Sequence, residues 1–257
     1  MPRQARTQSK TGVYHVIVRG VNKQEIFHDD HDRIKYLDLL KRYKSQSGFR
    51  MYAWCLMGNH VHLLLKEESE GISLVMKRVG VSYAFYYHSK YRTAGHLFQD
   101  RFKSERVENQ KYFLTVARYI HQNPIKAGIV SLPHEWKWSS CLGYYGQTVY
   151  PPTLLDPNYL LSMFSPHLPI ARTEFKQFNE RNANDQCLDE SSVIRLTDDE
   201  ARVEIIKHIG SYQIPQVKSL PREERMTILK NIKTIPGLSQ RQAARILGVS
   251  PSLVFKV

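Results

Sequence analysis

Two histidines separated by a single residue form the sharpest chemical feature of this 257-residue sequence. They are His60 and His62, in the segment Asn59-His60-Val61-His62-Leu63. Alternate side chains of a β-strand point to the same face, so the two imidazoles would lie about 7 Å apart along one strand. Such a pair can bind one divalent metal ion and leave coordination positions open for a substrate. The same spacing also suits two hydrogen-bonded histidines in a buried sheet, so the pair alone leaves both interpretations open.

A tyrosine and an asparagine one helical turn apart are the second feature. In the segment Arg118-Tyr119-Ile120-His121-Gln122-Asn123-Pro124, Tyr119 and Asn123 fall on one face of a helix. A tyrosine hydroxyl can attack phosphorus when a metal ion polarises the phosphate, and the Asn123 amide oxygen can ligate that ion. Alternatively, Tyr119 packs in a core and Asn123 caps the helix before the proline. His121 projects from another side of the helix, and we interpret it as structural or DNA-facing.

The charge balance favours a polyanionic partner. The chain has 37 Lys and Arg against 24 Asp and Glu, a net charge of +13. No strongly amphipathic basic helix stands at either terminus, so nucleic acid is favoured over an anionic membrane surface. Basic residues alternate with aromatic residues between positions 90 and 126, as a surface for single-stranded DNA would require. The candidate DNA-contacting residues are Arg101, Lys103, Arg106, Arg118, Arg241 and Arg245.

Cysteine usage and hydropathy indicate the compartment. Cys55, Cys141 and Cys187 lie far apart without a CxxC pattern, which argues against a disulfide framework or a cysteine zinc site. No run approaches the roughly 20 apolar residues that span a bilayer. The basic N-terminus is not followed by the apolar segment of a secretory signal. We therefore predict a cytoplasmic protein without a membrane partner.

The elements that must position these residues follow from the residue patterns. Strand-like segments are expected at 12–19, on both sides of a tight turn within 50–66, and within 97–107, with helices at 28–47, 73–91 and 110–123. Asn109 can cap the last helix, and Pro124 should end or kink it near Asn123, because proline lacks an amide hydrogen. The order βαββαβα predicts an α+β fold in which helices pack on one mostly antiparallel sheet.

Three regions follow along the chain. Residues 1–150 are expected to form the catalytic domain, and 151–195 a connecting segment, because 179–192 is polar and rich in acids and amides. Residues 196–257 are expected to form a small all-α domain. In it Ser239 caps a helix that runs through Leu247, Gly248 makes the turn, and Pro251 opens a further helix. This spacing is typical of a helix-turn-helix that binds DNA.

Several motifs in this order resemble the single-tyrosine HUH transposases of bacterial insertion sequences, and most closely the REP-associated tyrosine transposases. The matching residues lie in the first 145 positions: Tyr14-His15-Val16, Met57-Gly58-Asn59-His60-Val61-His62-Leu63-Leu64, Leu97-Phe98-Gln99-Asp100-Arg101-Phe102, Arg118-Tyr119-Ile120-His121-Gln122-Asn123-Pro124 and Trp138-Ser139-Ser140. The number and order of these motifs make the resemblance far more specific than the histidine pair alone.

The resemblance implies a ferredoxin-like sheet and a role for each motif residue. His60 and His62 would ligate Mg²⁺ or Mn²⁺, Tyr119 would be the nucleophile, and Asn123 would be the third ligand. Simpler members often carry glutamine one turn after the tyrosine, and Gly58 replaces the proline usual in its turn, which affects turn rigidity rather than chemistry.

The function expected from the resemblance is a metal-dependent single-stranded DNA endonuclease and strand transferase, a transposase-like enzyme. It would form a 5′-phosphotyrosine intermediate on hairpin-forming repeat DNA. The alternative is a DNA-binding regulator that uses the helix-turn-helix and carries a vestigial active site; intact His60, His62 and Tyr119 speak against it. The sequence leaves open the target DNA, monomer or homodimer, the use of Tyr119 in cis or in trans, and a mobile or domesticated role.

Overall fold

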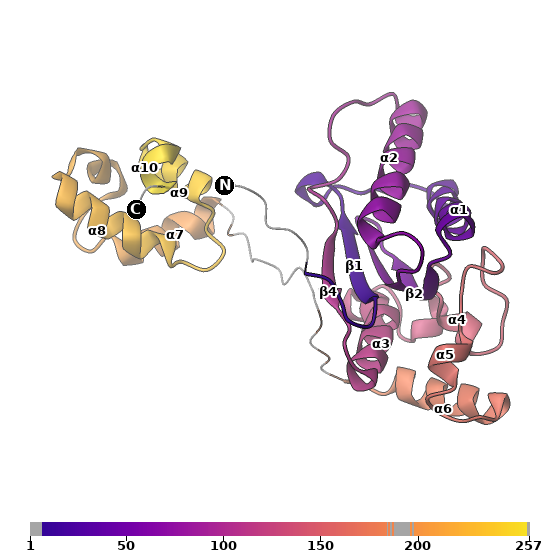
Figure 1. The fold of residues 1–257 in the computed structure, drawn as a ribbon. Helices are drawn as coiled ribbons and strands as arrows, with labels where there is room; N and C mark the ends of the chain where they lie inside the picture. The colour runs from indigo at the N-terminus through magenta and orange to yellow at the C-terminus, as the bar shows by residue number, and fades with distance from the viewer. Residues whose placement is uncertain (1–6, 184, 186, 188–195, 197, 256–257) are drawn as a thin grey trace. The chain divides into compact units, whose positions relative to one another are not determined.

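The computed structural model describes residues 7–183, 185, 187, 196 and 198–255 (Figure 1). The chain divides into two compact units, residues 1–188 and 189–257. Each unit has its own hydrophobic core, so each is described by itself.

A four-stranded antiparallel sheet forms the centre of the first unit. Its strands are Val13–Arg19 (β1), Arg50–Leu56 (β2), His60–Lys66 (β3) and Lys103–Arg106 (β4), in the order β2-β3-β1-β4. The central strands β1 and β3 are almost entirely buried, which is the pattern of a sheet covered on both sides. The Met57 amide donates to the His60 carbonyl oxygen at 2.9 Å and closes the predicted turn between β2 and β3.

Helices cover both faces of this sheet. They are Asp30–Ser47 (α1), Ile72–Tyr91 (α2), Gln110–Lys126 (α3), Cys141–Tyr144 (α4), Asn158–Leu161 (α5) and Leu168–Glu180 (α6), with 3-10 turns at Val21–Lys23 (η1) and Pro133–Glu135 (η2). Helices α1 and α2 lie on one face, and α3, α5 and α6 on the other (Figure 1). The order β1-α1-β2-β3-α2-β4-α3 confirms the predicted α+β fold with a ferredoxin-like antiparallel sheet.

Helix α3 carries the tyrosine motif. It begins as expected, because the Asn109 side chain accepts a hydrogen bond from the Tyr112 amide at 2.8 Å. The expectation that it ends or kinks near Asn123 is wrong, since the helix continues for two residues beyond Pro124. The proline lies in the last turn, where its missing amide hydrogen removes one hydrogen bond, and the Ala127 amide still reaches the Asn123 carbonyl oxygen at 3.0 Å.

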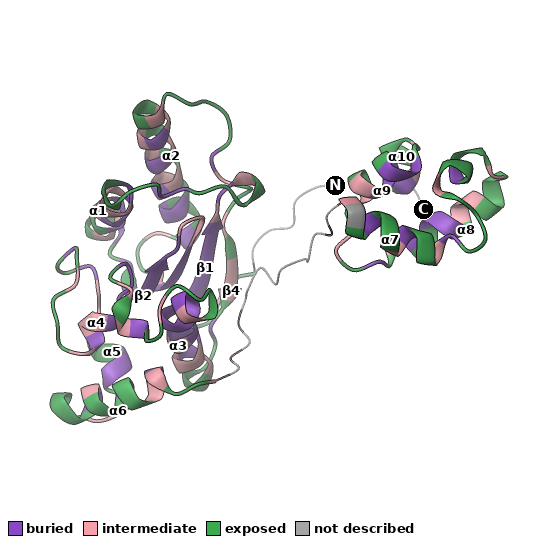
Figure 2. Ribbon diagram, turned by 180° about the vertical axis from the view of Figure 1, so that it is seen from behind, coloured by how far each residue is buried: buried purple, intermediate pink, exposed green. Residues whose placement is uncertain are grey.

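Two separate cores pack against the sheet. The core beneath α1 and α2 contains Trp54 and Leu63, and the core beneath α3 contains Phe113, Leu160 and Phe175. Figure 2 shows β1 and β2 buried between these layers and the partly exposed β4 at the edge of the sheet, whereas the outer faces of the helices are exposed. The second core is the one that positions the candidate site, because α3 lies over β2 and β3 within it.

The start of the expected connecting segment, 151–195, is instead part of the first unit. Leu160, Leu161, Ala171 and Phe175 of α5 and α6 are buried against α3. These residues pack in the same core as α3, so the first unit extends well beyond residue 150. Residues 184, 186 and 188–195 of that segment lie outside the described residues.

The described part of the second unit is helical throughout, as predicted. Its elements are Asp198–His208 (α7), Ile214–Ser219 (η3), Arg222–Lys233 (α8), Gln240–Leu247 (α9) and Pro251–Phe255 (α10). The Ser239 side chain caps α9 by accepting from the Gln242 amide at 3.1 Å. Gly248 ends α9 with a left-handed φ of 66°, which glycine adopts without steric cost. None of the helices in the described ranges combines the length and apolarity needed to cross a membrane.

Candidate metal and tyrosine site

The histidine pair lies on the sheet face that α3 covers. In the β1–β3 ladder His60 faces Arg19 and His62 faces Ile17. The two imidazole centroids are 5.0 Å apart. His62 is only 1% exposed, whereas His60 is half-buried. The pair therefore has one ring inside the protein and one ring at its surface.

Helix α3 brings Tyr119 onto these rings. The Tyr119 ring is edge-on to His62, with centroids 5.7 Å apart, and edge-on to His15, with centroids 5.9 Å apart. Its side chain is 3% exposed, and the Lys126 ammonium lies 4.1 Å from its ring centroid. Tyr119, the histidine pair and the Lys126 ammonium therefore lie close together within a single chain.

Asn123 lies one helical turn beyond Tyr119, and its side chain is hydrogen-bonded to the backbone of Tyr119. Its Nδ2 donates to the Tyr119 carbonyl oxygen at 2.8 Å, and the residue is 8% exposed. This bond uses the amide nitrogen, so the amide oxygen is the atom that a metal ion could take. Within the described part of the chain no hydrogen bond joins Asn123 to either histidine of the pair, and its role as a ligand stays a prediction.

His15 joins the site although we assigned it no role from the sequence. Its Nε2 lies 3.0 Å from His62 Nδ1, and the two rings stack with centroids 5.3 Å apart. The side chain is fully buried. Strand alternation puts His15 on the same face as Arg19, but its contact with His62 depends on the register between β1 and β3, which a local pattern does not reveal.

The buried histidine is suited to a metal ion. Burial, with smaller contributions from the nearby charges of Arg19 and Lys126, lowers the pKa of His62 well below its usual 6.5, so the ring is neutral with a lone pair available. His62 Nε2 is buried and makes no hydrogen bond within the described residues. An unpartnered buried nitrogen is costly unless something binds it, and a divalent cation fits that atom.

The described residues contain no group of three or more His, Cys, Asp and Glu side chains arranged to hold a metal ion. A cation at His60 and His62 would therefore take its remaining ligands from an amide oxygen, from water or from a substrate phosphate. This donor set of nitrogen and oxygen atoms suits Mn²⁺ and, less specifically, Mg²⁺.

Arg118 is not an exposed DNA contact in this structure. Its guanidinium makes two hydrogen bonds of 2.6 and 2.8 Å with the Asp185 carboxylate and lies 4.1 Å from the Phe178 ring centroid. The side chain is only 12% exposed, so the residue is part of the packing between α3 and the segment after α6. This ion pair could not be predicted because Asp185 is distant in sequence, and a contact of Arg118 with DNA stays a prediction.

The other candidate DNA contacts remain at the surface. Arg101, Lys103, Arg106, Arg241 and Arg245 are all exposed. The Arg245 guanidinium forms a bidentate ion pair with the Asp198 carboxylate, and both nitrogen–oxygen distances are 2.6 Å.

His121 is structural rather than DNA-facing. It is fully buried, its Nε2 lies 2.8 Å from Ser140 Oγ, and its Nδ1 lies 3.2 Å from Asn179 Oδ1. These contacts join α3 to α6 and to the residue before α4.

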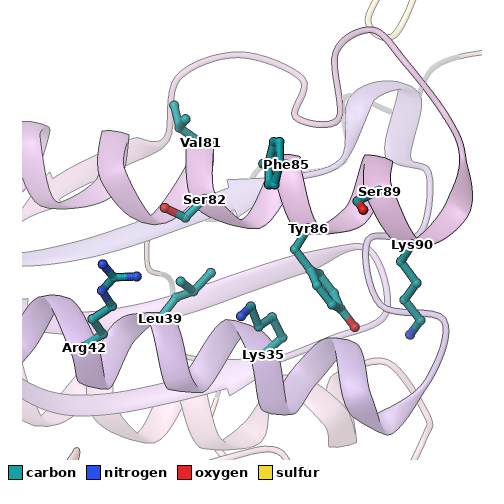
Figure 3. A pocket seen from close by; sticks show the side chains of 9 residues that line it. All are labelled: Lys35, Leu39, Arg42, Val81, Ser82, Phe85, Tyr86, Ser89 and Lys90. Atoms are coloured by element: carbon teal, nitrogen blue, oxygen red, sulfur yellow. The ribbon is translucent and has the colours of Figure 1, made fainter.

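Two grooves of the first unit lie apart from the site. One, of about 600 Å³, runs between α1 and α2, where Tyr86 extends from α2 towards α1 (Figure 3). It is lined by Lys35, Leu39, Arg42, Val81, Ser82, Phe85, Tyr86, Ser89 and Lys90. The other, of about 790 Å³, lies under the loop 95–102. Neither is lined by His60, His62 or Tyr119.

The sequence comparison finds one similar family. Residues 8–123 match the family described as Transposase IS200 like. This span begins before β1 and ends at Asn123 in α3, so it contains the histidine pair and the tyrosine motif together. The match covers 116 of the 257 residues, all of them in the first unit, and this part of the chain is similar to that family of transposases.

Among solved structures, two similar chains carry related descriptions. A REP-associated tyrosine transposase bound to a REP hairpin is 19% identical, with 59% of this chain and 89% of that chain covered and a TM-score of 0.48. A protein of Deinococcus radiodurans R1 that is provisionally assigned as a transposase is 21% identical, with 47% and 97% covered and a TM-score of 0.33. No curated protein matches the sequence.

Proposed function

We propose that the chain is a metal-dependent endonuclease and strand transferase for single-stranded DNA, with Tyr119 as its nucleophile. The observation that carries the proposal is the packing of Tyr119 edge-on against His62, whose Nε2 is buried without a hydrogen-bond partner in the described part of the chain. The similarity of residues 8–123 to the IS200-like transposases agrees with this chemistry.

His60, His62 and the Asn123 amide oxygen would hold the metal ion. When bound, Mg²⁺ or Mn²⁺ acts as a Lewis acid on the scissile phosphate. The Tyr119 oxygen forms a bond to phosphorus, the bond from phosphorus to the 3′ oxygen breaks, and the phenolic proton is released while the 3′ oxygen takes up a proton. The products are a 5′-phosphotyrosine and a free 3′-hydroxyl. The covalent bond keeps the energy of the phosphodiester, so rejoining requires no ATP.

Two cations are positioned to neutralise the charge that this step develops. Lys126 lies over the Tyr119 ring, and Arg19 is opposite His60 on the same sheet face. Either can pair with a phosphate oxygen or with the forming tyrosinate. Tyr119 is 3% exposed, and the Lys126 ammonium covers part of its ring.

The substrate that we propose is single-stranded DNA with a hairpin. The chain carries a net charge of +13, and a structurally similar transposase binds a REP hairpin. The second unit would add affinity through α9 and α10. The described part of α10 has five residues, which is short for reading a major groove, so exposed Arg241 is expected to contact phosphate rather than bases.

The experiment that tests this function replaces His60 and His62 together with alanine. Cleavage of a hairpin-tailed oligonucleotide should be lost, while salt-sensitive binding of the same DNA persists, because basic residues supply most of the phosphate affinity. The double variant His31→Ala, His167→Ala, which alters two exposed histidines outside the site, is the matched control. Full cleavage by the His60 and His62 variant, or by the native chain in excess chelator, would contradict a metal role for the pair. DNA binding without cleavage by the native chain would favour the regulator.

A further inference from the structure

His15 is a buried imidazole that contacts a proposed metal ligand and has no part in the chemistry described above. Its side chain is fully buried, and its Nε2 lies 3.0 Å from His62 Nδ1. Strand pairing fixes this position, because β1 runs between β3 and β4. His15 faces Leu64 on one side and Glu105 on the other, and His62 is its diagonal neighbour on β3.

The contact has a consequence for the tautomers of both rings. A neutral imidazole carries one proton, so one ring nitrogen donates and the other accepts. If His62 offers the lone pair of Nε2 to a metal ion, its proton is on Nδ1 and is donated to His15 Nε2. The proton of His15 is then on Nδ1, the atom that lies 4.0 Å from the Glu105 carboxylate. This assignment gives each ring one proton, and it leaves His15 Nδ1 without a hydrogen-bond acceptor among the described residues.

The assignment of one proton to each ring requires that His15 is uncharged. The His15 side chain is fully buried, an environment that favours the uncharged imidazole over the imidazolium. At 4.0 Å the Glu105 carboxylate, which accepts a hydrogen bond from the Tyr112 hydroxyl, is too distant for a hydrogen bond to His15 Nδ1, and its negative charge favours a proton on that nitrogen electrostatically.

His60 has an equivalent arrangement with an unambiguous partner. Its Nδ1 lies 2.6 Å from Asn59 Oδ1. The Asn59 Nδ2 donates to the Lys23 carbonyl oxygen at 3.0 Å, which fixes the orientation of the amide and leaves Oδ1 facing the ring. An amide oxygen only accepts, so the proton of His60 is on Nδ1 and its Nε2 carries the lone pair. Both histidines of the pair thus have a partner at Nδ1.

We propose that His15 is a positioning residue that holds His62 as the tautomer protonated on Nδ1, with Glu105 biasing His15 to accept that proton. Asn59 has the same role for His60. Such partners orient a ligating imidazole and raise the basicity of the nitrogen that binds the metal. The inference rests on the proposed metal site, to which it adds the residues that prepare the ligands.

The first test measures Mn²⁺ binding to the full chain without DNA, by electron paramagnetic resonance of the unbound ion. His15→Leu fills a similar volume but cannot accept a hydrogen bond, and it should weaken binding by about 10–100-fold, as loss of an outer partner does elsewhere. His15→Gln keeps an acceptor oxygen at the position of Nε2 and should restore most of the affinity. Glu105→Gln should cause a smaller loss than His15→Leu. Thermal unfolding in chelator verifies that each variant is folded.

Native affinity in His15→Leu, or equal losses in the Leu and Gln variants, would overturn the proposal. A second measurement is independent of any variant. Long-range ¹H–¹⁵N spectra of the native chain without metal should show His62 protonated on Nδ1, and protonation on Nε2 would also overturn the proposal. A native chain that binds no Mn²⁺ would contradict the metal site itself, while the spectra would still decide whether His15 sets the tautomer.

Discussion

The Tyr119 ring stands edge-on to the His62 imidazole, with 5.7 Å between the ring centroids. One residue comes from α3 and the other from β3, so their relationship depends on how α3 packs on the sheet. Phe113 and Ile120 anchor that helix in the core beneath it, where they are 3% and 0% exposed. The candidate nucleophile and the candidate ligands are therefore positioned by regular secondary structure rather than by loops.

Arg118 should matter for stability and not for DNA affinity. Arg118→Met leaves the Asp185 carboxylate, which is 10% exposed, without its cation, and we expect a loss of about 3 kcal/mol in the free energy of unfolding. Arg106→Met is the control, because that side chain is 47% exposed and should change stability by less than about 0.5 kcal/mol. Urea unfolding measures both. A folded Arg118→Met chain whose salt dependence of DNA binding falls by about one phosphate contact would restore Arg118 as a DNA contact.

Two substitutions distinguish the role of the Asn123 amide nitrogen from the role of its amide oxygen. Asn123→Ala and Asn123→Asp both remove the Nδ2 bond to the Tyr119 carbonyl oxygen, so each should lose about 0.5–1.5 kcal/mol of stability. Only aspartate keeps an oxygen for the metal ion. Mn²⁺ titration should therefore show near-native affinity for Asn123→Asp and a loss of at least about tenfold for Asn123→Ala. Equal affinity in the two variants would remove Asn123 from the ligand set.

His121 should make the fold less stable in acid. Burial lowers its pKa to about 4, against about 6.5 in the unfolded chain. Above pH 6.5 both states are neutral; below it the unfolded chain binds a proton that the folded chain binds only near pH 4. The contribution to stability is thus present above pH 6.5 and is lost by up to about 1.4 kcal/mol per pH unit as the pH falls through this window.

Urea unfolding at several pH values tests this assignment. The native chain should lose more stability between pH 6.5 and 4 than His121→Gln, while the exposed control His167→Gln should follow the native curve. His15, with its pKa lowered to about 3, keeps some acid sensitivity in every one of these chains. A constant difference between native and His121→Gln across the window would show that His121 does not titrate in this way.

Much of the fold followed from local pattern. Strand alternation predicted that His60 and His62 share one face of a strand, and helical spacing predicted that Tyr119 and Asn123 share one face of a helix. Each prediction depends only on residues within a single element. The caps of α3 and α9 were also local, because Asn109 and Ser239 each bond an amide three residues away.

Features that depend on distant parts of the chain could not be predicted. The contact of His15 with His62 requires the register of two strands, and the ion pair of Arg118 requires the chain to return to α3 at Asp185. Helix α6 was assigned to a connecting segment because its C-terminal end is polar, although Phe175 packs in the core beneath α3.

The most direct measurement is the covalent adduct formed by Tyr119→Phe. The protein is incubated with Mg²⁺ and a radiolabelled single strand that carries a hairpin, and the products are separated by denaturing gel electrophoresis. Removing one hydroxyl changes little volume, so the fold should survive, whereas cleavage and adduct should both vanish. Tyr159→Phe is the matched control, since that residue is 48% exposed on α5 and its ring packs against Tyr52 and Phe113.

Peptide mapping of the native adduct then identifies the modified residue. We expect the native chain to yield a labelled peptide that contains Tyr119. Tyr119→Phe should carry no label, and Tyr159→Phe should be labelled like the native chain. An undiminished adduct in Tyr119→Phe, or a native label mapped to another tyrosine, would contradict the assignment of Tyr119 as the nucleophile.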